Sequence, residues 1–427
     1  MWCNIKQNFE YDVIVAGGGP SGCAAATASA RQGARTLLLE ATYTLGGMGT
    51  SGLVTCFAPF GDGEKQISCG IAKEISFQSN SAAYNTEPDA IGWVYSSPED
   101  LKRIYDRLVL NSGADICFGA TVCDAKTDGN KVTALLVADK SGLTAYYAKA
   151  FIDCTGDGDV AAKAGAAFHL GDETGILQPA TLCFVLTGVH TENFPLDTLN
   201  GAHPNSPIHK ILALGNKYPL ITDTHFCFDQ LASGTISFNA GHIWESNSTD
   251  PIQISRSIVK GRELARQFRD ALAEVEPETF GDAYLVATAP LLGIRESRRI
   301  VGEYTLTLQD YIDRKSFPDE VARNCYYIDI HGAAPDHEER PYRTGESHGI
   351  PFRCLIPKGY SNLLIAGRAI SCDRIVMGST RVMPNCLTTG EAAGVAAALV
   401  VRKEIPISAL DVAELRSILR ENGAYLP

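Results

Sequence analysis

The sequence predicts an α/β protein with a Rossmann-like domain, made of a parallel sheet and a β-meander, into which an α+β domain is inserted. Three observations predict this fold. Within the first forty residues a strand, a glycine-rich turn, a helix and a second strand follow one another. Strands run into glycine again near residues 156 and 367, and the periodicity between these points is mixed. We expect one domain from residues 1–167 and 354–427, with residues 168–353 as the insert.

The glycine-rich turn fits the pattern G-x-G-x-x-G. An apolar strand over 11–16 leads into Gly17, Gly19 and Gly22, and an alanine-rich helix separates them from a strand over 36–39. Gly17 permits the tight turn, Gly19 lets the backbone approach a pyrophosphate, and Gly22 allows close packing of helix on strand. A phosphate would then lie at a helix N-terminus, where free N–H groups favour negative charge. This order of elements predicts a dinucleotide site.

Two further features indicate which dinucleotide binds. Glu40 ends the second strand, where a carboxylate can hydrogen-bond the hydroxyls of an adenosine ribose and would repel a 2′-phosphate. FAD or NAD is therefore favoured over NADP. The loop over 45–52 is dense in glycine, which lets a large flat ring approach the backbone and favours FAD, although by itself it could be a flexible surface turn.

Turn and capping signals predict the other elements of the first domain. Pro98 and two acidic residues should begin an amphipathic helix that runs through Leu110. A β-meander is expected from strands over 115–124, 131–139 and 143–147, which glycine-containing turns separate. The segments 149–159 and 362–368 should both return to the nucleotide-binding sheet as strands followed by glycine turns.

Composition argues against several classes of partner and site. The 37 basic and 49 acidic residues give a net charge of −12 without any basic block, so nucleic acid and anionic membranes are not expected partners. The longest apolar run, 392–401, is too short to cross a bilayer, and residues 1–10 lack the apolar stretch of a secretory signal. Thirteen cysteines without Cys-x-x-Cys favour free thiols in a reducing compartment and count against a zinc ribbon. We expect a cytoplasmic protein without a metal centre.

Four stretches carry a resemblance to a known family. They are residues 13–40; 151–159 together with Gln178-Pro179-Ala180-Thr181; Leu292-Gly293-Ile294-Arg295-Glu296-Ser297-Arg298-Arg299-Ile300; and 363–394, which includes Gly378-Ser379-Thr380-Arg381-Val382-Met383-Pro384. On these stretches the chain resembles the bacterial FAD-dependent oxidoreductase family of the glutathione-reductase-like flavoprotein superfamily. The resemblance implies an FAD cofactor, a flavin domain split by a substrate domain, and redox chemistry. It implies no particular substrate, and it leaves the electron acceptor and the oligomeric state unknown. The absence of a second complete G-x-G-x-x-G favours re-oxidation by a separate electron acceptor.

The motif and the resemblance together give a set of expected FAD ligands. These are Gly17, Gly19, Pro20, Ser21, Gly22 and Glu40; Gly46, Gly47 and Met48; Val122; Thr155, Gly156 and Asp157; and Gly367, Arg368, Arg381, Val382, Met383 and Asn385. A flavin that has accepted a hydride carries negative charge near N1, so the protein must supply positive potential there. Arg381 is the cation nearest in sequence to the C-terminal segment 384–394, which could supply this potential. The small residues of 390–394 suit a helix that packs close beneath the flavin ring. Thr388-x-x-Glu391 fits a capping box that would fix the start of this helix.

The expected catalytic residues come from the insert. Arg295, Arg298 and Arg299 form a cluster that can hold a carboxylate bidentately, although nearby glutamates could neutralise it instead. His331 leaves a strand beside a glycine, as a residue at the mouth of a pocket does, and His242 has a similar setting.

A histidine with a pKa near neutral is the natural proton acceptor when an alcohol or amine is oxidised. We therefore expect His331, Arg295 and His242 to be the catalytic residues, with His169 as a further histidine candidate.

These observations predict an enzyme in which a small polar or anionic organic substrate exchanges a hydride with N5 of FAD. A flavin monooxygenase is one alternative, although the sequence lacks a second complete G-x-G-x-x-G for NADPH. A non-catalytic FAD-binding redox sensor is another. A third is a nucleotide-binding protein of the related thiazole-synthase branch, against which the full C-terminal flavin segment counts. The direction of the redox reaction is not predicted.

Overall fold

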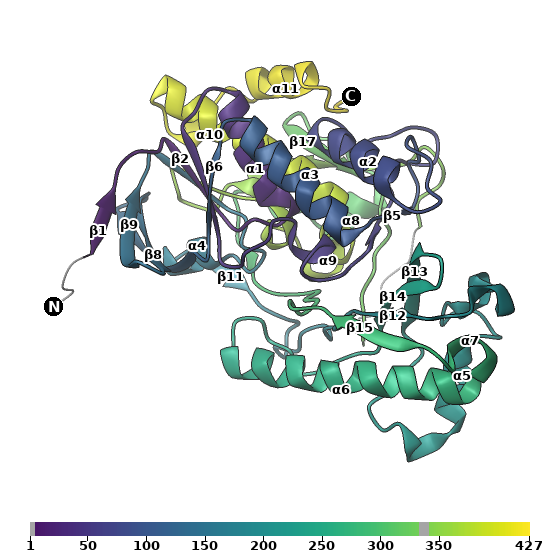
Figure 1. The fold of residues 1–427 in the computed structure, drawn as a ribbon. Coiled ribbons are helices and arrows are strands. Elements are labelled where there is room, and N and C mark those ends of the chain that lie inside the picture. Colours follow the sequence, from purple (N-terminus) through teal and green to yellow (C-terminus); the bar gives the residue numbers. More distant parts are fainter. Residues whose placement is uncertain (1–4, 333–340) are drawn as a thin grey trace.

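The computed structural model describes residues 5–332 and 341–427, and it confirms the predicted α/β fold with a Rossmann-like domain. Figure 1 shows two bodies side by side: a larger one that contains the N- and C-terminal segments, and a smaller one made from the middle of the chain. The middle of the chain is therefore inserted between two parts of the larger body.

A five-stranded parallel sheet forms the centre of the larger body. Its strands follow the order β19 (Leu363–Ile365), β10 (Ala150–Asp153), β2 (Val13–Ala16), β3 (Thr36–Glu40) and β6 (Asp115–Phe118). Alternate side chains point to opposite faces, so Val13 and Val15 pack in one core while Ile14 and Ala16 pack in another. Because both faces are covered, the strands are continuous apolar runs.

Helices cover one face of this sheet. They are α1 (Pro20–Arg31), α2 (Ile71–Ala82), α3 (Pro98–Asn111), α10 (Met383–Lys403) and α11 (Val412–Glu421). Helices α1 and α10 pack very closely: a Cβ on Gly390 would lie 2.1 Å from Ser21 O, and one on Gly394 would lie 2.2 Å from Ala25 O. The glycines of α10 therefore serve the packing of this helix on α1, and the expectation that its small residues pack beneath a ring stays a prediction.

The expected capping box at Thr388 and Glu391 is also wrong. Helix α10 begins at Met383 with Val382 as its N-cap, so both residues lie inside the helix. Glu391 instead accepts a hydrogen bond from the backbone N–H of Ile71, the first residue of α2, at 2.8 Å. Burial raises the pKa of this carboxyl to about 7.

A pH-dependent contribution to stability follows from Glu391. Because its pKa in the folded protein lies above its ordinary value of 4.5, the group stabilises the fold at low pH, and this contribution is lost as pH rises through about 7. The loss amounts to about 3 kcal/mol. We expect Glu391→Gln to remove this part of the pH dependence in urea unfolding, whereas the exposed control Glu99→Gln should keep it. An unchanged pH dependence in Glu391→Gln would contradict this account.

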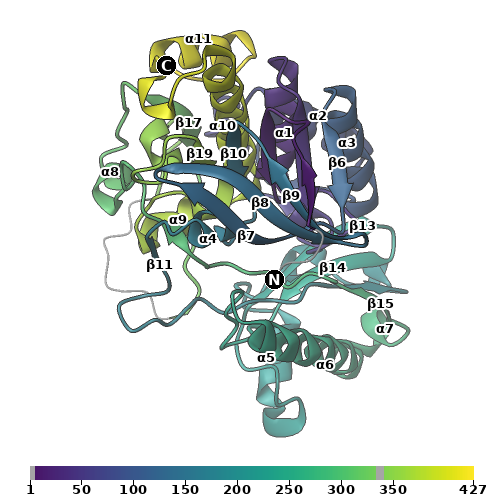
Figure 2. The ribbon, with the colours of Figure 1, turned by 90° about the vertical axis from the view of Figure 1, so that its left-hand side faces the viewer.

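An antiparallel meander covers the other face of the parallel sheet, as Figure 2 shows. It consists of β7 (Thr121–Asp128), β8 (Lys131–Asp139) and β9 (Gly142–Tyr147), and β1 (Lys6–Asn8) pairs in parallel with β9. The expected single strand over 115–124 is two strands, because Gly119, with a φ of +64°, turns the chain between β6 and β7. The short helix α4 (Asp159–Lys163) follows β10.

The smaller body has its own sheet and core. Its antiparallel strands follow the order β13 (Phe226–Ala232), β14 (Thr235–Ala240), β12 (Phe184–Thr187) and β15 (Tyr284–Thr288). The long helix α6 (Pro251–Val275) lies along this sheet, with α5 (Pro207–Ala213) and α7 (Pro277–Phe280) beside it. Phe184 lies at the centre of the core, with its ring centroid 5.1 Å from that of Phe238 and 5.7 Å from that of Phe268.

The remaining elements are short. They are the strand pairs β4 (Cys56–Phe57) with β5 (Val94–Tyr95), β11 (Phe168–His169) with β16 (Arg299–Ile300), and β17 (Glu320–Asn324) with β18 (His348–Pro351), and the helices α8 (Leu308–Ile312) and α9 (Arg374–Thr380). Buried residues of 306–352 pack in the core of the larger body, although they fall within the expected insert of 168–353. The core of the smaller body takes residues 180–292. The domain boundaries stay a prediction.

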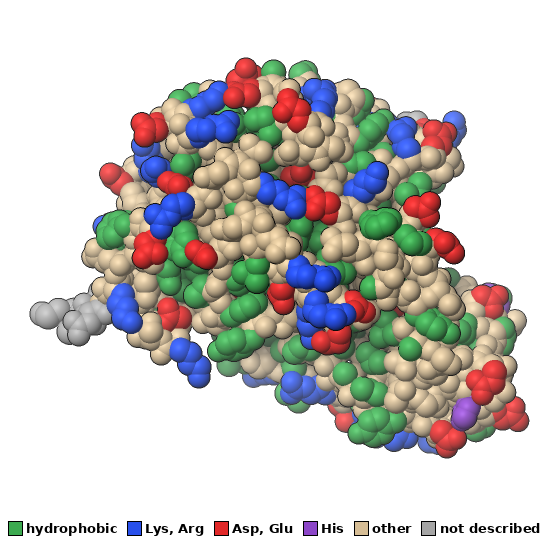
Figure 3. All heavy atoms as spheres, turned by 45° about the horizontal axis from the view of Figure 1, so that its top comes forward, with side chains coloured by type: hydrophobic (Ala, Val, Ile, Leu, Met, Phe, Trp, Pro, Cys, Tyr) green, Lys and Arg blue, Asp and Glu red, His purple; other side chains and the backbone are tan. Residues whose placement is uncertain are grey.

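Across the described residues, no helix combines the length and the apolar character that a membrane span requires. On the face drawn in Figure 3, acidic and basic side chains are interspersed, and the described residues there form no continuous basic patch.

Candidate active site

The glycine turn after β2 leaves an open space at the N-terminus of α1. Gly17 has a φ of +95°, and Gly19 is the N-cap of α1 without a side-chain cap or an acidic residue in the first turn. A Cβ built on Gly19 would meet no described atom within 4 Å. The helix N-terminus with its free N–H groups therefore faces room for an anion, which fits the pyrophosphate of FAD.

The glycine-dense loop lies against this turn and is not a free surface turn. Gly46 N donates to Gly18 O at 2.8 Å, and a Cβ on Gly47 would lie 3.1 Å from Gly19 Cα. The Glu40 carboxylate accepts from Gly18 N at 2.6 Å and from Thr42 N at 2.7 Å. These bonds fix the carboxylate at the end of β3, beside the turn, where the ribose of FAD is expected.

Replacing Glu40 tests the nucleotide-binding part of the site. Glutamine has one acceptor oxygen, so in Glu40→Gln one of the two N–H groups at Gly18 and Thr42 would face an amide NH₂. We expect FAD binding to weaken by about 1.5–3 kcal/mol, roughly 10- to 150-fold in Kd. Titration of apoprotein with FAD measures this, with the exposed Glu87→Gln as control. Equal affinity of Glu40→Gln and wild type would remove Glu40 from the cofactor site.

A second loop closes on the same turn from the C-terminal segment. Arg368 donates to Gly156 O at 2.9 Å, to Asp157 Oδ1 at 2.7 Å and to Ile294 O at 2.8 Å. A Cβ on Gly367 would lie 2.7 Å from Ser21 Oγ. The segments 149–159 and 362–368, which both contain expected FAD ligands, thus lie together beside α1.

Three of the expected FAD ligands have other settings. Thr155 bonds Asp153 and the N–H of Asp159 at the start of α4. Val122 lies in β7 and packs against the core between sheet and meander. Asn385 donates to Asn324 Oδ1 at 2.6 Å within a buried amide network. Asn385 and Val122 do not line the pocket described next.

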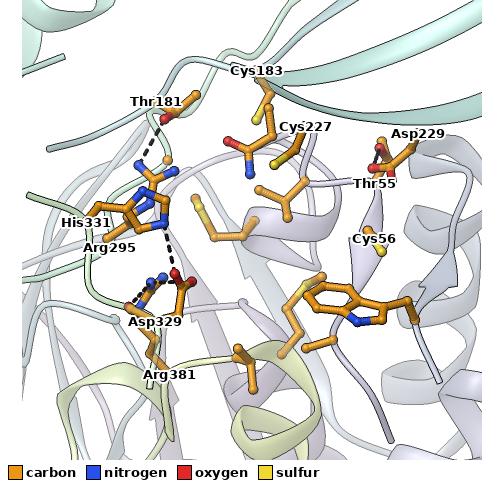
Figure 4. Close-up of a pocket in the computed structure, with 18 of the residues that line it drawn as sticks. Thr55, Cys56, Thr181, Cys183, Cys227, Asp229, Arg295, Asp329, His331 and Arg381 are labelled. Atoms are coloured by element: carbon orange, nitrogen blue, oxygen red, sulfur yellow. Dashed lines mark hydrogen bonds and ion pairs between the residues drawn. The ribbon is translucent and has the colours of Figure 1, made fainter. Parts of the chain in front are cut away.

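A cavity of about 520 Å³ lies between the two bodies, and we call it the central pocket (Figure 4). Met48, Arg368, Arg381, Val382 and Met383 line it from the larger body. The rest of the lining holds polar and aromatic side chains, among them Trp93, Tyr95, Thr181, Cys183, His225, Cys227, Asp229, Arg295, Tyr327, Asp329 and His331. Helix α10 points its uncapped N-terminus here, which supplies positive potential. A pocket of this size and mixed lining suits a flat ring and a small ligand.

Arg295 is a buried cation in the wall of the central pocket. Its guanidinium donates to Pro179 O and Thr181 Oγ1, both at 2.9 Å, and to His225 Nε2 at 3.2 Å. Among the described residues no carboxylate lies within ion-pair distance of it. Burial, together with the charge of Arg381, lowers the pKa of Arg295 to about 10. A buried cation without a carboxylate partner stabilises a bound anion.

The expected cluster of three arginines is divided in the structure. Arg298 pairs with Asp159 at 2.8 Å, and Arg299 pairs with the buried Glu296 at 2.8 Å. Neither lines the central pocket. Arg295 alone of the three is placed to hold a substrate.

His331 and Asp329 lie together in the pocket wall. His331 Nε2 is 3.1 Å from Asp329 Oδ1, and Arg381 donates to Asp329 Oδ2 at 3.0 Å. Burial and the charge of Arg295, opposed by the hydrogen bond to Asp329, together lower the pKa of His331 to about 4. Burial raises the pKa of Asp329, but the bond from His331 and the Arg381 charge outweigh it and hold that pKa below its usual range. At neutral pH His331 is therefore an uncharged base beside an ionised carboxylate.

The other two candidate histidines differ in position. His242 lies behind His331, with its Nε2 2.8 Å from His331 Nδ1, and it is not part of the pocket lining. His169 is exposed on β11 and pairs with Arg299 in a short strand pair outside the central pocket.

Sequence reasoning missed several polar residues of the pocket. His225, Cys227 and Asp229 alternate at period two, and all three line the pocket from β13 or the residue before it. Burial raises the pKa of Asp229 to about 6, against the hydrogen bond that Thr55 Oγ1 donates at 2.6 Å. In the sequence, His225, Cys227 and Asp229 alternate with Phe226 and Phe228, and this period of two could have predicted a strand with one polar face.

A dinucleotide turn, a ring-sized pocket and a buried base and cation within it define an FAD-binding enzyme of the oxidoreductase class. A family model described as FAD dependent oxidoreductase matches residues 12–419, and the chain belongs to this family. FAD is accordingly its cofactor.

Comparison with known proteins adds a local sequence match and several matches of fold. Nicotine dehydrogenase from Pseudomonas putida is 56% identical over 43 residues, which are 10% of this chain and 9% of that protein. The aromatic hydroxylase CabE of angucycline biosynthesis superposes with a TM-score of 0.52 at 14% identity, over 97% of this chain and 68% of CabE. The anhydrotetracycline hydroxylase OxyS from Streptomyces rimosus gives a TM-score of 0.48 at 13% identity, over 97% of this chain and 66% of OxyS. The likeness to CabE concerns the fold alone.

Proposed function

We propose that the protein oxidises a small anionic organic substrate in the central pocket, with a hydride passing to FAD and a proton to His331. The observation that carries this proposal is the buried guanidinium of Arg295, which lacks a carboxylate partner among the described residues and lies beside His331 in one wall. A carboxylate on the substrate would supply the missing negative charge.

Bound FAD supplies the hydride acceptor. The side chains supply position and proton transfer. Arg295 orients the substrate anion, His331 takes the proton from the hydroxyl or amine that is oxidised, and Asp329 holds the resulting imidazolium. Arg381, which donates to Asp329, and the N-terminus of α10 both lie at the pocket and stabilise the negative charge that the hydride brings. The substrate loses one hydride and one proton.

The glutathione-reductase-like superfamily is the placement we propose for the fold. The strand, glycine turn, helix and Glu40 at the end of β3 support it, as does the meander that follows β6 in the chain and packs on the sheet. The monooxygenase alternative has the fold match to CabE in its favour.

An anaerobic experiment tests the proposed function. Holoprotein is mixed with single compounds from a panel of 2-hydroxy acids, amino acids and matching neutral alcohols and amines, and the absorbance of bound flavin is followed. We expect one of the acids to bleach the flavin without oxygen, and its neutral analogue to be much slower. A flavin that none of these acids bleaches, or a product that carries an oxygen atom from O₂, would contradict the proposal.

A further inference from the structure

A continuous line of hydrogen bonds leads from the central pocket to the protein surface. It begins at Asp329, runs through His331 and His242, and ends at Asp223. The three contacts measure 3.1 Å, 2.8 Å and 3.0 Å in that order. The side chain of Asp223 is 29% exposed whereas that of His242 is 11% exposed, so the line ends toward solvent.

When both histidines are neutral, this line has fewer ring protons than hydrogen bonds. Its three hydrogen bonds need three protons, because both terminal carboxylates can only accept when they are ionised. Two neutral imidazoles carry one N–H each, so the line is one proton short. A proton taken up at His331 completes all three bonds. Release of a proton at Asp223 returns the number of ring protons to two.

We propose that His331, His242 and Asp223 form a proton relay that carries the substrate proton from the central pocket to solvent. This inference rests on the proposed function, since a hydride oxidation releases one proton per turnover. Before turnover His331 carries its proton on Nδ1, which faces His242, and its Nε2 faces Asp329 without a proton. Nε2 accepts the proton of the substrate hydroxyl or amine, a proton then moves from His331 Nδ1 to His242 Nε2, and the Nδ1 proton of His242 passes to Asp223 and on to water. His242 and Asp223 thus act through His331.

The groups that surround the line fix the tautomer of His225 and keep its ring uncharged. Arg295 can only donate, so His225 Nε2 must accept and the His225 ring carries its proton on Nδ1. That ring stacks on His242 with centroids 4.5 Å apart. Burial first, and then the charge of Arg295, lowers the pKa of His225 well below its usual range. His225 is therefore neutral and stays outside the relay, while Arg381 faces Asp329 at the pocket end.

Ring nitrogens of His225, His242 and His331 also lie within 4.8 Å of one another, a spacing that can hold a metal ion. The ring geometry favours the relay. The planes of His225 and His242 are within 15° of parallel and stacked, so their in-plane lone pairs do not converge on a single point between the rings. The guanidinium of Arg295 adds positive charge at His225 Nε2.

Two measurements on the holoprotein test the relay. In ¹⁵N NMR of histidine-labelled protein, titrated from about pH 8 to about pH 3, we expect the ring signals of His242 and His331 to shift together in one step that adds one proton. In His242→Phe, which keeps a ring against His225, His331 should titrate at a different midpoint. In Asp223→Asn the common midpoint should fall, because a negative charge is lost. His169→Phe, on the surface, is the control.

The second measurement uses turnover of an acid identified by anaerobic bleaching. His242→Phe should lower kcat by up to about 10²-fold with little change in KM, and added imidazole should restore part of the rate. Separate titration of His242 and His331, or one equivalent of a divalent metal bound at wild-type histidines by elemental analysis, would overturn the relay. Because the NMR measurement needs no substrate, failure of the relay is distinguishable from failure of the proposed function.

Discussion

His331→Ala protein is expected to bind FAD normally and to lose turnover by about 10²–10⁴, the range for removal of a general base. The physical reason is its position: His331 lines the central pocket as a neutral base whose pKa burial lowers to about 4, and it makes no contact with the nucleotide turn. The loss should appear in kcat, measured with an artificial electron acceptor. The FAD content of the purified protein, measured by flavin absorbance, should stay at one FAD per chain.

The exposed His169→Ala is the matched control and should keep wild-type turnover. A second comparison is the pH dependence: below the His331 pKa of about 4 the base is protonated, so the wild-type rate should fall as pH is lowered toward that value, and the residual rate of His331→Ala should lack this fall. Wild-type turnover by His331→Ala would make the residue structural.

Gly19→Val is expected to fold and to lose FAD. Gly19 has a φ of −68° and a ψ of −176°, a conformation that valine adopts without strain, and a Cβ there meets no described atom within 4 Å. The valine side chain would occupy the space where the pyrophosphate approaches the helix N-terminus. We expect affinity for FAD to fall by at least about a hundredfold, which corresponds to about 2.7 kcal/mol.

Two comparisons separate a blocked site from a damaged fold. Gly92→Val places the same side chain at an exposed position with open space, and it should retain FAD. Thermal unfolding of Gly19→Val should match that of wild-type apoprotein. If Gly19→Val kept full FAD occupancy with native affinity, the pyrophosphate would have to bind elsewhere.

The features that the sequence predicts well are those fixed by neighbours along the chain. The order of strand, Gly17, Gly19, Gly22 and Glu40 is local, and the fold and the FAD cofactor that it predicts are confirmed. The expected capping box fails because Thr388-x-x-Glu391 describes a spacing and not a helix start. Contact with α2, which lies far away in sequence, decides the use of Glu391.

The substrate half of the site depends on contacts that are distant in sequence. Arg295, Arg298 and Arg299 have a spacing that would share one face of a helix, but the segment is not helical and sends them to different partners. The pocket role of His225 arises because the segment containing Gly241 bonds back to it, and that of His331 because residues 329–331 pack on Arg381 and His242. Local sequence patterns do not predict these contacts, because the residues that make them lie far apart in the chain.

A crystal structure of the holoprotein with FAD tests the central claim most directly. The account predicts the pyrophosphate at the turn of Gly17 to Gly22 and the flavin ring in the central pocket beside Met48 and Val382, with His331 and Arg295 across the remaining space. A flavin ring bound outside this pocket, or one from which His331 and Arg295 are both remote, would contradict it.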